Sequence, residues 1–317
     1  MAQEPSQRVY ASALEGEVFI GVTANSLLFF IYTYTFLIQP HLKKPIDLIF
    51  MHLTMVNILT MVFQSIPNIL SSFGVRGFLD NAGCQTVFYV YRVTRSLSIC
   101  TTSLLSAFQA IIISPNHSKW ARLKPKLSTW IFPSFLFFWV INMLIYIHII
   151  ESVRAKWNFT VVGRGFVHAY CQTRQSGDGQ SWSFINVLVT RDVLFVALMI
   201  MSSLYMVGLL YRHHRGARHI HSSSLSRQTS PENKATHTII CLVFCFVLFY
   251  CCNNFVTLYA FYRPEKDSRL VGIAGILSSC YPTFCPFLLM KNNKNISKLT
   301  SSLSMMRMPF SSRGLLG

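Results

Sequence analysis

Four ionisable residues, Arg92, Arg95, Arg191 and Asp192, interrupt long apolar stretches of this chain. A charge within a membrane span is costly and normally faces a partner or a water-filled cavity. Arg92 and Arg95 share one helix face, whereas adjacent Arg191 and Asp192 should point in different directions. At about 1.5 Å per helical residue, all four lie roughly 12 to 17 Å below the outer helix ends.

These four side chains have two possible roles, in ligand binding or in a structural network. We expect Asp192 to offset Arg92 or Arg95 and another arginine to face a ligand cavity. An unpaired guanidinium suits an anionic or sulfated hydrophobic compound, because it binds oxyanions through paired hydrogen bonds. The alternative is that all four form a structural network or reach the membrane interface.

The surrounding sequence predicts membrane helices that would position these residues. Of 317 residues, 52% are apolar and 12% charged, and the mean hydropathy is +0.41. Seven stretches of at least 19 residues lack Asp, Glu, Lys and Arg, and about 20 apolar residues span a bilayer as a helix. We predict an all-α membrane protein, a single seven-helix domain over 1–317, with helices at 18–39, 48–70, 84–113, 127–150, 183–211, 235–262 and 270–290.

The distribution of charge predicts the orientation of these helices. The connections 39–47, 114–126, 212–234 and the tail 291–317 hold 16 Lys or Arg and two acidic residues. The segments on the other side hold nine basic and eight acidic residues. By the positive-inside rule the N-terminus lies outside and the tail 291–317 inside. The net charge of +17 is therefore a topology signal, and we expect no nucleic-acid partner.

Cysteine positions and one glycosylation sequon agree with this orientation. Of the nine cysteines, only Cys84 and Cys171 lie outside the interior of the predicted helices, both on the outer side, where oxidation is permitted. A disulfide between them would hold the loop 151–182 over the mouth of the bundle. Asn158 is the only outer Asn-x-Ser/Thr sequon and is the expected glycosylation site.

The sequence lacks the residues and repeats that enzymes, metal sites, retinal proteins and many transporters need. The predicted spans contain no His-Glu-x-x-His and no nucleophile with its base, and His148 is expected to be the single mid-helix histidine. The histidines at 213, 214, 219 and 221 fit a solvated loop, so we expect no metal, no cofactor and no enzymatic activity. A retinal protein needs a lysine in the last span, and 270–290 contains none. Seven helices cannot divide into the equal inverted halves of many transporters.

Several polar positions within the spans predict how the bundle is organised. Asn25 and Asn57 should form interhelical hydrogen bonds that hold helices in register. Pro282 and Pro286 remove helical hydrogen bonds, so the last span is either statically kinked or hinged.

Four strings resemble the vomeronasal type 1 receptors, which are rhodopsin-like G-protein-coupled pheromone receptors. They are KPIDLI, YRVTRSLSICTTSLLSAFQAIIISP, LFYCCNNF and SSCYPTFCPFLL, and the resemblance covers about residues 16 to 300. LSAFQAI replaces the common Asp-Arg-Tyr, and Asn57 replaces a frequent aspartate. Bitter taste receptors are the nearest alternative, but their His-x-Lys-x-Leu signature is absent from LLYRHHRGARHI.

The resemblance implies a plasma-membrane receptor for a small-molecule pheromone. We expect the ligand to enter from outside between the third, fifth, sixth and seventh helices, and we expect binding to open the cytoplasmic face to a heterotrimeric G protein of the inhibitory class. The ligand-binding candidates are Tyr91, Arg92, Arg95, Arg191, Asn253, Asn254 and Tyr259. The G-protein-facing candidates are Lys119, Arg122, Lys124, Arg212, Arg215 and Arg218.

Overall fold

The structure is a computed structural model in which long helices dominate. It describes residues 5–38, 44–72, 80–148, 150, 153–155, 171–173, 178–220, 231–262 and 268–290. The α-helices are α1 (Pro5–Ile38), α2 (Pro45–Ser72), α3 (Asn81–Ile113), α4 (Leu127–Tyr146), α6 (Asp178–Ile220), α7 (Pro231–Tyr262) and α8 (Ser268–Met290). A 3₁₀ helix, η2 (Lys119–Lys126), and two short strands, β1 (Val153–Ala155) and β2 (Cys171–Thr173), complete these elements.

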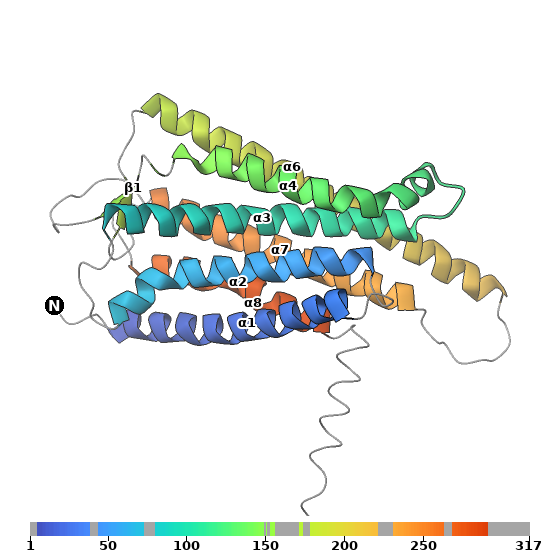
Figure 1. The fold of residues 1–317 in the computed structure, drawn as a ribbon, viewed down its shortest axis with the longest axis horizontal. Helices are drawn as coiled ribbons and strands as arrows, with labels where there is room; N and C mark the ends of the chain where they lie inside the picture. The colour runs from blue at the N-terminus through green and yellow to red at the C-terminus, as the bar shows by residue number, and fades with distance from the viewer. Residues whose placement is uncertain are drawn as a thin grey trace, which may run out of the picture.

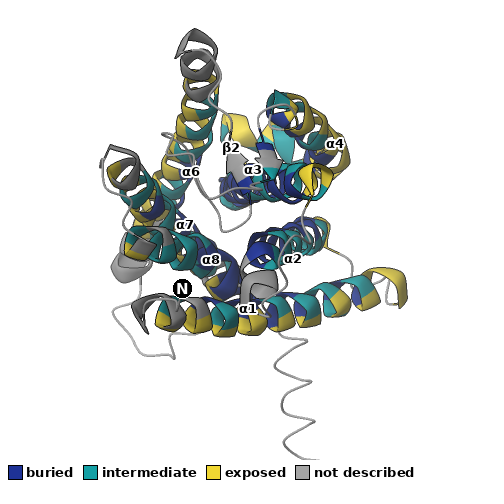
Figure 2. Ribbon diagram, turned by 90° about the vertical axis from the view of Figure 1, so that its left-hand side faces the viewer, coloured by how far each residue is buried: buried dark blue, intermediate teal, exposed yellow. Residues whose placement is uncertain are grey.

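Seven helices in the described part of the chain are long and apolar enough to cross a membrane. They lie side by side along the long axis of the molecule (Figure 1). Their outward faces expose large apolar side chains, such as Phe19 at 74% and Phe132 at 70% exposure, and Figure 2 shows this exposure along α1 and α4. Such faces are expected to contact lipid, so the predicted seven-helix bundle is confirmed.

Several helices extend beyond the stretches predicted from hydropathy. α1 begins at Pro5 and not near residue 18, and α6 continues to Ile220, within the segment expected to be a loop. A helix can continue past the hydrocarbon once its polar side chains reach water or headgroups, whereas hydropathy marks only the apolar part. The span of α1, Ser12–Ile38, consequently includes Glu15 and Glu17. The tail 291–317, Asn158 and the serine-rich segment 221–230 lie outside the described residues.

Helix α3 occupies the centre of the bundle and contacts α2, α4, α6 and α7. Its buried face is rich in serine and threonine, which permit close helix approach and can satisfy their hydroxyls on their own helix. Thr101 Oγ1 donates to the Leu97 carbonyl at 2.7 Å, and Thr102 Oγ1 donates to the Ser98 carbonyl at 2.8 Å. This arrangement makes α3 the element against which the other helices are positioned.

The outer end of the bundle carries the disulfide between Cys84 and Cys171. Cys171 begins β2, which pairs with β1 in an antiparallel ladder that places it opposite Ala155. Asn81 Oδ1 accepts a hydrogen bond from the backbone N–H of Ala155 at 2.8 Å, which ties β1 to the start of α3. The expected cross-link is therefore formed, and it holds this hairpin over the end of α3. We call this end outer and the η2 end inner, following the charge distribution.

Asn25 and Asn57 form the interhelical hydrogen bonds that were expected of them. Asn25 Nδ2 on α1 donates to the Pro282 carbonyl on α8 at 2.9 Å, and Asn57 Oδ1 on α2 accepts from Ser98 Oγ on α3 at 2.9 Å. Both asparagines are fully buried. α8 is continuous through Pro282 and Pro286, so a hinge at these prolines stays a prediction.

Candidate functional site

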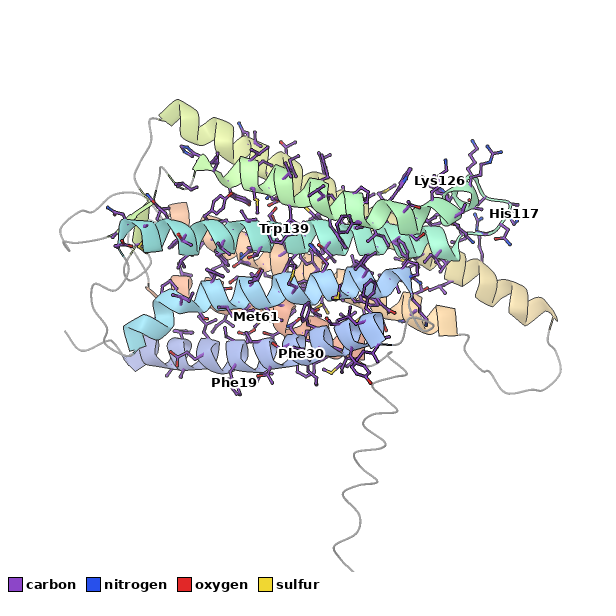
Figure 3. All side chains as sticks on the ribbon, in the orientation of Figure 1. Phe19, Phe30, Met61, His117, Lys126 and Trp139 are labelled. Atoms are coloured by element: carbon purple, nitrogen blue, oxygen red, sulfur yellow. A yellow bond between two sulfur atoms is a disulfide. The ribbon has the colours of Figure 1, made fainter. Side chains whose placement is uncertain are left out.

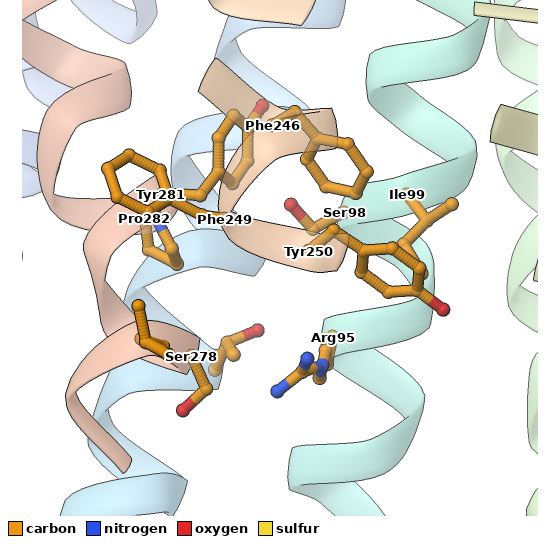
Figure 4. A pocket seen from close by; sticks show the side chains of 11 residues that line it. Arg95, Ser98, Ile99, Phe246, Phe249, Tyr250, Ser278, Tyr281 and Pro282 are labelled. Carbon is orange, nitrogen blue, oxygen red and sulfur yellow. The ribbon is translucent and has the colours of Figure 1, made fainter. Parts of the chain in front are cut away.

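A small cavity lies between α2, α3, α7 and α8 (Figure 4). Its volume is about 30 Å³, enough for roughly one water molecule. Its wall is aromatic and aliphatic on one side and polar on the other, and Arg95 is the only charged residue among the described residues that line it. The lining residues are Thr60, Arg95, Ser98, Ile99, Phe246, Phe249, Tyr250, Leu277, Ser278, Tyr281 and Pro282.

Two neutral side chains hold the Arg95 guanidinium at this cavity. Arg95 Nη1 donates to Tyr91 Oη at 2.9 Å, one helical turn away on α3. With the Asn253 amide oriented by its neighbours, its oxygen accepts from Arg95 Nη2 at 2.6 Å and its nitrogen donates to the Ala274 carbonyl at 2.8 Å. Among the described side chains, no carboxylate lies within ion-pair distance of Arg95. The hydrogen bonds that position the guanidinium therefore come from neutral groups in the described part of the chain.

Asp192 pairs with its own neighbour, which corrects the expected pairing with Arg92 or Arg95. Arg191 Nη2 lies 2.6 Å from Asp192 Oδ1, and Arg191 Nε donates to the same oxygen at 2.9 Å. Adjacent Cα–Cβ bonds on a helix do diverge, but the flexible arginine stem lets the guanidinium fold back onto the next residue. The expectation that these two side chains point apart was therefore wrong.

Arg191 also contacts α4, which fixes it away from the cavity. Its Nη1 donates to Asn142 Oδ1 at 3.1 Å and its Nη2 to Tyr146 Oη at 3.0 Å. The guanidinium carbon lies 5.3 Å from the centre of the Tyr146 ring, within the range of a cation–π contact. Arg191 thus links α6 to α4. For this residue, the structure agrees with the alternative interpretation, in which the four ionisable residues form a structural network.

Tyr250 connects the ion pair to the cavity. Its hydroxyl on α7 donates to Asp192 Oδ2 on α6, while its side chain lines the cavity beside Arg95. The ring stacks on Phe246 at a centroid distance of 5.6 Å and an interplanar angle of 13°. A change in the cavity at Tyr250 therefore acts directly on the contact between α6 and α7.

The remaining ligand candidates do not line the cavity. Tyr91 and Asn253 touch Arg95, whereas Arg92, Asn254 and Tyr259 do not line the cavity. Tyr259 is 44% exposed near the outer end of α7. The fifth span, α6, contributes no lining residue and α2 contributes Thr60. The expected ligand position between the third, fifth, sixth and seventh helices is not tested by this cavity and stays a prediction.

A buried histidine that was not expected from the sequence joins α2, α3 and α4. His52 Nε2 accepts from Trp139 Nε1 at 3.0 Å, and His52 Nδ1 lies 3.0 Å from Thr101 Oγ1. Since Trp139 can only donate, the neutral ring carries its proton on Nδ1 and donates it to Thr101. Phe135 stacks on the imidazole at 4.1 Å. His148 is therefore not the single mid-helix histidine, and the string IFMHLTMV contained the missed signal.

Comparisons with known proteins agree with this architecture. The model of the vomeronasal organ pheromone receptor family matches residues 10–302. Human vomeronasal type-1 receptor 4 is 37% identical over 250 residues, covering 79% of this chain and 83% of the relative. Rat vomeronasal type-1 receptor 97 is 34% identical over 291 residues, covering 92% and 93%. A zebrafish olfactory receptor class A-like protein 1 is 31% identical over 283 residues, covering 87% of each.

The chain belongs to the vomeronasal organ pheromone receptor family. It is accordingly a chemosensory G-protein-coupled receptor and a multi-pass protein of the plasma membrane. The bitter taste receptor and transporter alternatives are set aside, because the family match spans nearly the whole chain.

In this vomeronasal-family receptor, polar contacts lead from the cavity toward the inner end. Tyr281, in the cavity wall, lies with its hydroxyl 2.7 Å from Thr102 Oγ1 on α3. About two turns further in, Gln109 Nε2 on α3 donates to Thr236 Oγ1 on α7 at 3.1 Å. Gln109 belongs to LSAFQAI, the string that replaces Asp-Arg-Tyr. The contact between α3 and α7 at the inner end is thus a neutral hydrogen bond.

The basic candidates at the inner end differ in how far they are available to a partner. Lys119, Arg122 and Arg212 are all exposed at the surface. Lys124 is half-buried, because its Nζ donates to the Ser114 carbonyl at 2.6 Å and so caps the end of α3. Arg215 and Arg218 lie on α6, but their side chains lie outside the described residues.

Proposed function

We propose that this receptor binds a small-molecule pheromone at the cavity beside Arg95 and activates an inhibitory-class heterotrimeric G protein at its inner end. The observation that carries the ligand site is a guanidinium held between neutral partners in the wall of a cavity. The ligand class that suits it is an anionic or sulfated hydrophobic compound. Its oxyanion would pair with Arg95, while its apolar body would pack against Phe246 and Phe249.

The cavity must enlarge to accept such a ligand. Pockets for drug-sized molecules have volumes of about 300 to 1,000 Å³, whereas this one measures about 30 Å³. Since Phe246, Phe249 and Tyr250 form its α7 wall, ligand binding favours arrangements in which α7 moves away from α3. The ligand shifts the population toward this wider form, in proportion to its preference for it.

Movement of α7 also provides the link to the G protein. α7 carries Tyr250, which contacts Asp192 on α6, and Thr236, which accepts the inner hydrogen bond from Gln109. Displacing α7 therefore loosens its contacts with both α6 and α3. The cations Lys119, Arg122 and Arg212 are already exposed, and their charge aids the encounter with a partner that binds the opened inner end.

The experiment is calcium imaging of cells that express the receptor together with an inhibitory-class α-subunit, during application of fractionated urine and steroid panels. We expect a reproducible calcium response that is absent from cells lacking the receptor. The response should also disappear when the α-subunit is replaced by a stimulatory-class one. A receptor-dependent response that persists with the stimulatory subunit would contradict the G-protein assignment.

A further inference from the structure

The outward face of α4 carries a groove of about 340 Å³ that is separate from the receptor cavity. It is lined by Trp130, Pro133, Ser134, Phe137 and Phe138, whose spacing places them on one face of the helix. Trp130 and Phe137 project at 56% and 59% exposure, while the compact proline and serine between them leave a hollow. The surrounding surface of α4 is apolar and exposed (Figure 2).

The groove lies in the half of the membrane next to the cytoplasm. α4 begins at Leu127, directly after η2 at the inner end. At about 1.5 Å per residue, positions 130 to 138 lie roughly 5 to 17 Å along the helix, almost entirely in the inner half of a hydrocarbon layer about 30 Å thick. A molecule in this groove would therefore be a component of the inner leaflet.

A cation stands at the inner end of the same helix face. Lys126 precedes α4 with helical φ and ψ of −89° and −12°, and it lies four residues before Trp130, so it extends the groove's face by one turn. Lys126 is exposed, and Figure 3 shows it beyond the end of α4. Residues 114 to 150 contain no Asp or Glu, so nothing in this stretch offsets the positive charge.

We propose that this groove, with Lys126, binds an anionic phospholipid of the inner leaflet. The acyl chain lies in the hollow between Trp130 and Phe137, and the phosphodiester and acidic headgroup contact Lys126. The inner leaflet is rich in anionic lipids, and basic side chains at its surface favour them. A sterol would fill the hollow but would gain less from Lys126, since its single hydroxyl carries no charge.

Native mass spectrometry of the purified full-length receptor, without agonist, tests the proposal. Phosphatidylserine and phosphatidylcholine with identical acyl chains are added in turn, and the retained lipid is measured. We expect several-fold more phosphatidylserine than phosphatidylcholine to be retained. Lys126→Gln should lower phosphatidylserine retention about fivefold, the effect of one cation near an anionic headgroup, and should leave phosphatidylcholine unchanged.

Two further variants separate the headgroup from the acyl chain. Lys44→Gln is the matched control, because Lys44 is an exposed inner cation outside α4 and η2, and it should leave both lipids unchanged. Ser134→Phe fills the hollow and should lower retention of both lipids, while thermal unfolding shows that the receptor remains folded.

Three results would overturn the assignment. The first is equal retention of phosphatidylserine and phosphatidylcholine by the wild-type receptor. The second is an equal loss of phosphatidylserine retention in Lys126→Gln and Lys44→Gln. The third is that cholesterol displaces phosphatidylserine to the same extent from the wild-type receptor and from Lys126→Gln. Because lipid retention is measured without agonist or G protein, these results stand apart from the outcome for the receptor cavity.

Discussion

Tyr250 on α7 donates a hydrogen bond to Asp192 on α6, and the same carboxylate neutralises Arg191. One aspartate thus joins two helices and compensates a partly buried cation, with side-chain exposures of 11% for Arg191 and 20% for Asp192. Removing the carboxylate leaves the arginine without a counter-charge in a poorly solvated place. The neighbouring cavity therefore depends on this ion pair for the position of Tyr250.

Asp192→Asn should destabilise the purified receptor by up to about 3 kcal/mol, because it leaves the charge of Arg191 uncompensated. The asparagine can still accept from Tyr250, so the change isolates the charge. The double variant Arg191→Gln with Asp192→Asn should recover most of this loss, as measured by thermal unfolding in detergent. A double variant that is less stable than the single one would argue against the pair.

Gly21 lies at a close approach of α1 to α2 and α8. A Cβ at this position would overlap Met61 Cε and would lie 2.7 Å from Thr283 Oγ1, and Met61 is fully buried. Gly21→Ala should therefore lower thermal stability, with an overpacking cost of about 1 to 3 kcal/mol. Gly16→Ala, on the same helix with nothing within 4 Å, is the control and should not destabilise the receptor. Equal stability of both variants would show that the Met61 and Thr283 side chains move aside without cost.

The hydrogen-bonded chain through His52 should contribute to the packing of α2 and α4 against α3. Trp139→Phe removes the donor to His52 Nε2 and leaves a buried acceptor unsatisfied, which costs about 1 to 3 kcal/mol. Trp120→Phe, at an exposed position in η2, should change the unfolding temperature little. Unchanged stability of Trp139→Phe would mean that water replaces the indole N–H.

The contact between Gln109 and Thr236 predicts the behaviour of the inner end without ligand. Gln109→Ala and Thr236→Val each remove a hydrogen bond worth about 1 kcal/mol and should raise the open population about fivefold. Basal G-protein signalling per receptor at the cell surface measures this population. Ser106→Ala is the control, because the Ser106 hydroxyl bonds within α3 to the Ser103 carbonyl, and it should leave basal signalling unchanged. Unaltered basal signalling in both test variants would mean that this bond does not restrain α7.

The sequence predicted the spans and the disulfide well because each follows from a strong one-dimensional signal. A charge-free run of about 20 residues has few alternatives to crossing the bilayer, and Cys84 and Cys171 were the cysteines left outside the interior of the predicted helices. Helix ends were less predictable, as α1 and α6 show, because they lie where polar and apolar residues are both tolerated.

The interior contacts were predicted less well, for a physical reason. Helical spacing gives the direction of a Cα–Cβ bond, but it does not fix where a long side chain ends, and Arg191 reached Asp192 by folding back. Which arginine faces the cavity likewise depends on how the helices are rotated, and Arg95 was one of several equivalent candidates in the sequence. His52 was missed because its partners lie on other helices, and its apolar surroundings in IFMHLTMV were the only local sign that it is buried.

The most direct test of the ligand site measures the potency of an identified anionic agonist on Arg95→Gln and wild-type receptors at matched surface expression. Loss of a charge-assisted contact should lower potency about 10- to 150-fold, whereas an uncharged analogue of the agonist should be weak on wild type and unaffected by the substitution. Equal potency of the anionic agonist on both receptors would contradict the assignment of Arg95 as its binding partner.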